Sequence, residues 1–182
     1  MTNEVSLESY ERLIHVHQGE CRISENQSVV LTTMLGSCVA ACLYDPEARV
    51  GGMNHFLLPE ADGTDRSVTL RYGAYAMELL VNGLLSVGAK RERLRAKLFG
   101  GSQIAHGRTN IGEKNAEFAE RYLKREGIPI VSRSVLGRYG RRIQFWPASG
   151  RARQLTLGVS PELVSKVQSG SLPSDYGSVE LF

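Results

Sequence analysis

The sequence predicts a mixed α/β (α+β) domain in which short β-strands alternate with two long helices. Eight short runs are rich in β-branched and aromatic residues and are bounded by Gly, Pro, Asn or Asp. Two longer segments carry apolar residues at helical spacing. The 182 residues are 42% hydrophobic and 23% charged, so the chain can bury a full core. We expect a single domain over residues 1–165, with two small domains as the lesser alternative, and a loose tail over residues 166–182.

The expected strands are short and separated by turn residues. They cover residues 15–24, 28–34, 39–44, 55–58, 96–99, 128–135, 141–146 and 154–159. One amphipathic helix is expected over residues 70–87, packed against a sheet and ended by Gly88. A second helix is expected over residues 112–126, with Asn110 as its N-cap and Gly127 as its stop.

Composition excludes several classes of protein. No apolar run approaches the roughly 18 to 20 residues that span a bilayer, and the first residues lack the features of a secretion signal. We therefore expect a cytoplasmic protein. Three cysteines predict no disulfide framework, and without a CxxC pair or clustered histidines we expect no metal. Of the three, Cys21 and Cys42 are interpreted as structural.

The net charge of +3 hides an asymmetry along the chain. Residues 1–90 contain six Lys and Arg against eleven Asp and Glu, whereas residues 91–182 contain sixteen against eight, so the halves carry about −5 and +8. A basic half can attract nucleic acid, an acidic membrane surface or an acidic protein, and a merely solvated face is an equally good interpretation. No RNA- or DNA-binding signature accompanies the basic residues, and Gly100-Gly101-Ser102 lacks the Walker pattern. We expect neither nucleic acid nor nucleotide as a ligand.

Two residues of catalytic type lie seventeen positions apart. They are Cys38, in Leu35-Gly36-Ser37-Cys38-Val39, and His55, in Gly51-Gly52-Met53-Asn54-His55-Phe56. A thiol reacts as its thiolate, and an imidazole within reach can take its proton and return it to a leaving group. Because sequential strands usually neighbour each other, the starting ends of these two strands can meet. The pattern predicts acyl transfer through Cys38; a buried structural cysteine and a histidine satisfied at a turn are the alternatives.

Neighbouring residues fit supporting roles in such chemistry. Backbone N–H groups around Gly36 and Ser37 can stabilise an oxyanion beside the sulfur. The hydroxyl of Thr32 can orient the ring of His55. Asn54 can either donate to the oxyanion or hold the turn before His55, and we favour the turn.

Four blocks of sequence occur in a fixed order along the chain. They are Thr32-Thr33-Met34-Leu35-Gly36-Ser37-Cys38-Val39-Ala40-Ala41-Cys42-Leu43-Tyr44-Asp45-Pro46, Gly51-Gly52-Met53-Asn54-His55-Phe56-Leu57-Leu58-Pro59, Ala96-Lys97-Leu98-Phe99-Gly100-Gly101 and Ile111-Gly112-Glu113-Lys114-Asn115. In order and spacing these blocks resemble the CheD family of chemoreceptor glutamine deamidases, over about residues 28–150.

The resemblance implies an α/β sandwich of mixed sheets flanked by helices, a cysteine-hydrolase fold similar to that of deamidating bacterial toxins. It implies Cys38 as the nucleophile, His55 as general base and acid, and Thr32 as the residue that holds His55. The implied enzyme is a protein-glutamine glutaminase that needs no cofactor. It converts glutamines of methyl-accepting chemotaxis receptors to glutamate through a thioester, with release of ammonia, during chemotaxis adaptation.

The resemblance also implies partners. Receptors would be the substrate, their acidic surfaces suiting the basic half of this chain, and a CheC-type phosphatase would be a second partner, with no insertion into a membrane. Rival interpretations are a non-catalytic adaptor of the same fold, or a cysteine amidase, transglutaminase-like enzyme or thiol protease.

Overall fold

The computed structural model describes residues 11–59, 66–103, 110–158 and 179–182. In chain order its elements are β1 (Arg12–His15), β2 (Cys21–Ser24), β3 (Val29–Leu35), β4 (Val39–Asp45), β5 (Val50–Phe56), α1 (Arg66–Ser86), the 3₁₀ turn η1 (Arg91–Arg93), β6 (Arg95–Gly100), α2 (Ile111–Arg125), β7 (Ile130–Val135), β8 (Gly140–Trp146), β9 (Arg151–Leu157) and β10 (Val179–Leu181). Both expected helices are confirmed to within a few residues.

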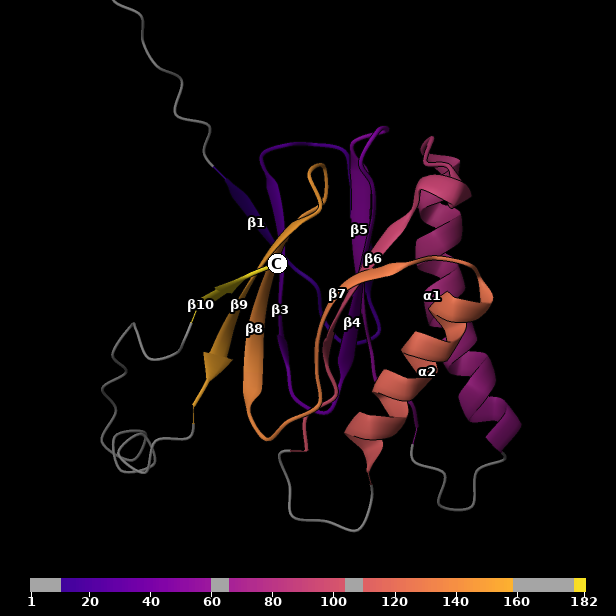
Figure 1. Ribbon diagram of the computed structural model, residues 1–182, viewed down its shortest axis with the longest axis vertical. Helices are drawn as coiled ribbons and strands as arrows, with labels where there is room; N and C mark the ends of the chain where they lie inside the picture. The colour runs from indigo at the N-terminus through magenta and orange to yellow at the C-terminus, as the bar shows by residue number, and fades with distance from the viewer. Residues whose placement is uncertain (1–10, 60–65, 104–109, 159–178) are drawn as a thin grey trace, which may run out of the picture.

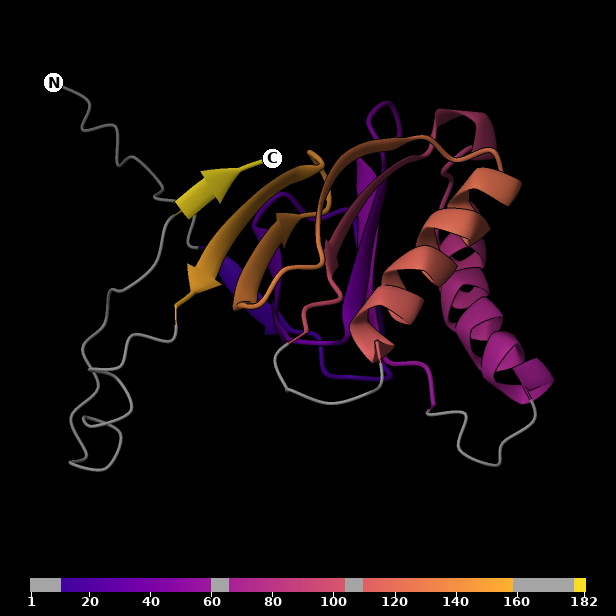
Figure 2. The same cartoon turned by 60° about the horizontal axis from the view of Figure 1, so that its bottom comes forward.

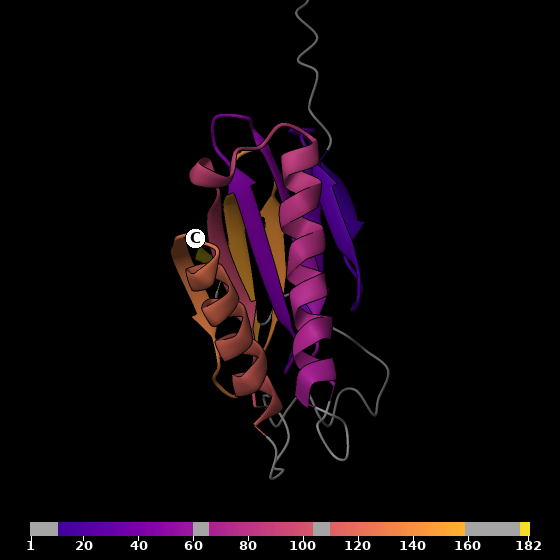
Figure 3. The ribbon, with the colours of Figure 1, turned by 90° about the vertical axis from the view of Figure 1, so that its right-hand side faces the viewer.

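Two five-stranded mixed sheets and the two helices form three layers (Figure 1). The first sheet has the strand order β1-β3-β8-β9-β10, and the second has the order β2-β5-β4-β6-β7. Helices α1 and α2 lie side by side on the second sheet, on the face turned away from the first (Figures 2 and 3). The expectation of mixed sheets flanked by helices is confirmed. Within the described residues, no helix is both long and apolar enough to cross a membrane.

Strand β4 is buried on both faces because it lies at the centre of the second sheet. Val39, Ala41 and Leu43 belong to the core under the helices. Ala40 and Cys42 belong to a second core between the two sheets. Side chains alternate between the faces of a strand, so one continuous apolar run fills both cores. The structural interpretation of Cys42, which is fully buried, is confirmed.

The single strand expected over residues 15–24 is wrong, since the segment contributes to both sheets. β1 pairs in parallel with β3 of the first sheet, whereas β2 pairs antiparallel with β5 of the second. Between them the chain turns at Gly19, whose φ of 85° lies in the region that glycine adopts readily. The turn brings residues 16–20 across the end of β5.

Strand β5 begins at Val50, so the turn expected at Gly51-Gly52 is in fact strand. A Cβ at Gly51 would meet the backbone oxygens of Pro147 and Leu43 at 2.5 and 2.9 Å. These glycines therefore serve close packing of backbones within a strand rather than chain reversal.

The loose tail expected over residues 166–182 is wrong for its last residues, while residues 166–178 lie outside the described part of the chain. β10 pairs antiparallel with β9. Phe182 exchanges two backbone hydrogen bonds with Ala152, and its ring lies edge-on to Phe99 with 5.3 Å between centroids. Nζ of Lys97 donates to the carbonyl of Phe182 at 2.8 Å. The C-terminal residues thus complete the edge of the first sheet.

Candidate active site

The antiparallel pairing of β4 with β5 brings Cys38 and His55 to one face of the second sheet. Val39 pairs with Phe56 and Ala40 with His55, so Cys38, one residue before β4, lies diagonally across from His55. Such diagonal neighbours have Cα atoms about 7–8 Å apart, and in the described structure Sγ of Cys38 makes its hydrogen bond to Gln18 rather than to the ring of His55. The starting end of β4 therefore meets the finishing end of β5, not its starting end as expected. Cys38 is half-buried against the core between the sheets.

His55 is held on several sides and is only 6% exposed. Its Nδ1 lies 2.9 Å from Oγ1 of Thr33 and 3.2 Å from the carbonyl oxygen of Val16. Its backbone carbonyl accepts from the N–H of Gly19 at 2.7 Å, and its own N–H donates to the carbonyl of Glu20 at 3.0 Å. Ring and backbone are therefore both fixed to the segment that joins β1 and β2.

These contacts decide which ring nitrogen of His55 carries the proton. The hydroxyl of Thr33 donates its single proton to the carbonyl of Val16, at 2.7 Å. Both groups near Nδ1 are then acceptors, so Nδ1 carries the hydrogen in the neutral ring. Nε2 is left with its lone pair, and this buried atom has no hydrogen-bond partner in the described structure. That is the tautomer a general base needs.

The prediction that Thr32 holds His55 is corrected, because Thr33 makes the contact. The hydroxyl of Thr32 donates to the carbonyl of Ile143 at 2.8 Å. Along β3 the residues Leu31, Thr33 and Leu35 are buried toward the core between the sheets, whereas Thr32 is partly exposed. Successive side chains of a strand point to opposite faces, so Thr33 lies on the same face as Leu31 and Leu35. This alternation in the sequence could have identified Thr33, rather than Thr32, as the inward-facing threonine.

The loop of residues 36–38 has all three of its carbonyl groups held by hydrogen bonds of 2.7–2.8 Å. The donors, in order along the loop, are the N–H of Ser102, Nδ2 of Asn115 and the N–H of Gly101. In a planar trans peptide the N–H points opposite to the C=O. The N–H groups of Ser37 and Cys38 are therefore directed away from these donors. Their role as donors to an oxyanion stays a prediction.

Two asparagines secure this region from the helix side. Asn115 of α2, which was not singled out from the sequence, also accepts from the N–H of Leu58 at 2.8 Å and so joins the 36–38 loop to the end of β5. Asn54 lies on the helix-facing side of β5: it accepts from the N–H of Ala41 and donates to the carbonyl of Ala76. The predicted role of Asn54 in the oxyanion or a turn is thus wrong, since its neighbour His55 faces the opposite side.

The glycine pair at the end of β6 lies directly behind Cys38. Gly100 has a φ of 108°, and a Cβ there would collide with the carbonyl oxygen of Cys38. A Cβ at Gly101 would lie 2.7 Å from the carbonyl oxygen of Gly112 in α2. The pair therefore allows β6, α2 and the 36–38 loop to approach closely.

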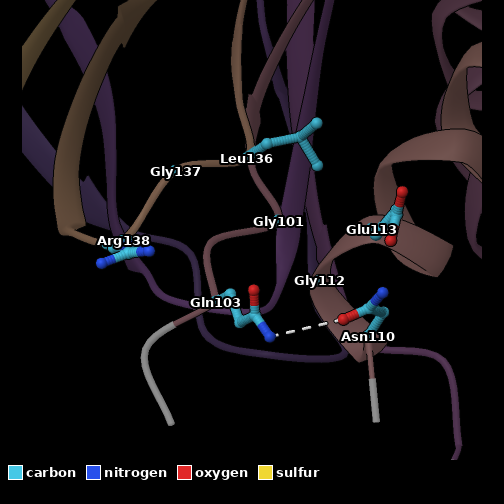
Figure 4. Close-up of a pocket in the computed structure, with 8 residues that line it drawn as sticks. All are labelled: Gly101, Gln103, Asn110, Gly112, Glu113, Leu136, Gly137 and Arg138. Atoms are coloured by element: carbon cyan, nitrogen blue, oxygen red, sulfur yellow. Dashed lines mark hydrogen bonds between the residues drawn. The ribbon is translucent and has the colours of Figure 1, made fainter. Parts of the chain in front are cut away.

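A pocket of about 280 Å³ lies beside these glycines (Figure 4). Nε2 of Gln103 donates to Oδ1 of Asn110, another residue that lines the pocket, at 3.4 Å. Asn110 precedes α2 but makes no side-chain cap; its backbone carbonyl accepts from Lys114 instead. Neither Cys38 nor His55 is among the described residues that line this pocket.

Burial sets the protonation of both reactive groups. It raises the pKa of the Cys38 thiol above the ordinary 9.0, an effect that the residue's own N–H partly offsets. It lowers the pKa of His55 below the ordinary 6.5, opposed by the carbonyl of Val16 and reinforced by His15 and His17. Near pH 7 the resting pair is a neutral thiol and a neutral imidazole. The described residues contain no cluster of side chains suited to a metal ion.

A half-buried thiol and a buried imidazole therefore lie on one face of a sheet within a sandwich of mixed sheets, and these are the residue types that a cysteine hydrolase uses. The family model described as "CheD chemotactic sensory transduction" matches residues 57–156. The chain is 53% identical over 173 residues to the "Probable chemoreceptor glutamine deamidase CheD" of Caulobacter sp. (strain K31), covering 93% of this chain and 92% of the relative. It is also 53% identical over 180 residues to the protein of that name from Acidiphilium cryptum (strain JF-5), covering 95% of each. The chain belongs to the CheD family.

A weaker likeness is found among solved structures. The Bacillus licheniformis hypothetical protein YfiH aligns with a TM-score of 0.45 and 15% identity, over 71% of this chain and 61% of that one.

Replacing Gly100 by alanine should disrupt the 36–38 loop, and Gly88 supplies a matched control. Gly88 has a φ of 99° but open space around its Cα, so Gly88→Ala should cost only backbone strain, about 1 to 3 kcal/mol. Gly100→Ala adds a backbone collision and should lower the free energy of unfolding further, as measured in urea. Equal losses in the two variants would contradict the packing role of Gly100.

The raised thiol pKa predicts the pH dependence of Cys38 alkylation by iodoacetamide. The thiolate is the reacting form, so the rate should still be rising with pH at pH 9. Mass spectrometry of the Cys38 peptide measures it separately from Cys21, whose pKa burial raises to about 11. A plateau already reached near pH 7 would indicate a resting thiolate–imidazolium pair and contradict the neutral one.

Proposed function

We propose that this chain deamidates glutamine side chains of chemotaxis receptors through Cys38. The observation that carries the proposal is Nε2 of His55: it is buried and unpartnered, and it belongs to the tautomer that can accept the Cys38 proton. Membership of the CheD family, whose relatives are named chemoreceptor glutamine deamidases, supports the substrate. The reaction is hydrolysis of a side-chain amide, the chemistry of a protein-glutamine glutaminase.

The reaction would proceed in two halves. His55 takes the thiol proton as Cys38 attacks the carboxamide carbon, and N–H groups of the 36–38 loop stabilise the tetrahedral oxyanion. His55 then protonates the departing ammonia, which leaves a thioester between Cys38 and the former glutamine. Water activated by His55 hydrolyses the thioester to glutamate and restores the thiol. No step calls for a metal or an organic cofactor.

The neutral resting pair fits this order of events. A thiol whose pKa is raised keeps its proton near pH 7, so the mechanism needs a base to take that proton. Proton transfer to Nε2 is then coupled to attack, and the hydrogen bonds at Nδ1 stabilise the imidazolium that forms.

Two partners are proposed, one from the charge of the chain and one from its membership of the CheD family. The half of the chain from residue 91 carries about +8, which would steer it toward acidic receptor surfaces in the cytoplasm. A CheC-type phosphatase is proposed as a second partner on the strength of the family.

Replacing Cys38 by alanine should abolish ammonia release from a purified receptor fragment without unfolding the protein, since the side chain is small and half-buried. Peptide masses of the receptor should increase by about one dalton per modified glutamine with wild-type protein only. Crosslinked receptor would indicate a transglutaminase-like enzyme, cleaved receptor a protease, and unmodified receptor a non-catalytic adaptor; each would contradict the proposal.

Thr33 and Thr32 form a matched pair for the ring-holding role. Thr33→Val removes the hydroxyl that contacts Nδ1 and should lower kcat about tenfold, the equivalent of one hydrogen bond. It should also move the acid limb of the pH–rate profile, because that limb reports His55. Thr32→Val removes a bond to Ile143 on the opposite face and should change neither. The reverse pattern would return the role to Thr32.

A further inference from the structure

A glutamine of this chain lies against its own reactive thiol. Gln18 belongs to the segment that joins β1 and β2, and its side chain is exposed on one side. Sγ of Cys38 donates to Oε1 of Gln18 at 3.4 Å. The contact joins residues twenty positions apart in the sequence, so it is created by the tertiary structure.

The segment that carries Gln18 is not free to move away from the site. The next residue, Gly19, donates its N–H to the carbonyl of His55 at 2.7 Å, and Glu20 accepts from the N–H of His55 at 3.0 Å. Two residues earlier, the carbonyl of Val16 accepts from Thr33 at 2.7 Å and lies 3.2 Å from Nδ1 of His55. Gln18 is therefore positioned by the same hydrogen bonds that position the imidazole.

A carboxamide at this place offers two kinds of group to the reaction. Its oxygen accepts the S–H in the resting state, whereas its NH₂ carries two donors. The terminal torsion of a glutamine is broad, so a rotation of the amide exchanges oxygen for nitrogen at little cost. When Sγ bonds to a substrate carboxamide carbon, the oxygen on that carbon becomes the oxyanion. Two covalent bonds then separate this oxygen from the sulfur. A donor within hydrogen-bond reach of Sγ can therefore reach that oxygen when both lie on the same side of the sulfur.

Building on the proposed function, we propose that Gln18 is a catalytic residue whose Nε2 donates to the oxyanion of the tetrahedral intermediate, together with the backbone N–H of Cys38. A side-chain amide is one of the groups that serve as oxyanion donors. The resting contacts are consistent with this role: the S–H is directed to Gln18, and Nε2 of His55 has no hydrogen-bond partner in the described structure.

The test compares deamidation with alkylation in two variants. Removal of one oxyanion donor should lower kcat for receptor deamidation about 100-fold or more in Gln18→Ala, with KM changed far less. Gln18→Glu keeps the shape but is acceptor-only when ionised, so it should lose at least as much. Iodoacetamide alkylation of Cys38 passes through no oxyanion, and its rate in Gln18→Ala should stay within about threefold of wild type. Glu25→Gln, at an exposed residue before β3, is the control and should leave both rates unchanged.

Several results would overturn the inference. An unchanged or increased kcat in Gln18→Ala would show that the amide is dispensable or obstructs the site. An equal fall in deamidation and alkylation would show that Gln18 acts on the thiol itself. Conversion of Gln18 to glutamate in wild-type protein, but not in Cys38→Ala, would make it a substrate in place of a donor. If wild-type protein releases no ammonia from receptor, the proposed function fails and this inference fails with it, whereas wild-type release without a defect in Gln18→Ala overturns the inference alone.

Discussion

Three consecutive carbonyl groups, at residues 36–38, are each held by a donor from the region where β6 ends and α2 begins. This set of hydrogen bonds fixes the orientation of the peptide units that flank the reactive sulfur, because each planar unit turns its N–H opposite to its C=O. The donors can approach only because Gly100 adopts a positive φ and Gly112 has no Cβ to meet the carbonyl of Gly101. The site therefore depends on a close approach of backbones, together with the side chain of Asn115.

The imidazole depends on a different junction, the packing of one sheet on the other. His55 belongs to the second sheet, while Thr33, which lies beside its Nδ1, belongs to the first. The connecting segment of residues 16–20 supplies the remaining contacts and also carries Gln18. The position, the tautomer and the lowered pKa of the His55 ring thus all follow from its burial between the two sheets. Neither sheet alone would produce them.

Much of the fold could be predicted from local patterns. The buried strand β4 and the helices α1 and α2 were found within a few residues of their ends, because β4 is one apolar run and each helix is followed by a glycine with a positive φ, Gly88 or Gly127. The division of residues 15–24 between two sheets could not be found, since a four-residue strand carries too little periodicity and Gly19 alone marks the turn. The start of β5 was misplaced because a glycine pair marks a turn as often as a close backbone contact.

The sequence by itself determined which chemistry to expect. It predicted a thiol–imidazole pair from a cysteine between a glycine-bearing loop and a buried strand and a histidine on the next strand. Only the tertiary structure decided which hydroxyl contacts the ring, which face Asn54 occupies, and that Gln18 contacts Cys38 and Asn115 the loop before it. The physical reason is that a residue type reveals what a side chain can do. Whether it does so depends on strand parity and on contacts between segments far apart in the chain, which no local pattern encodes.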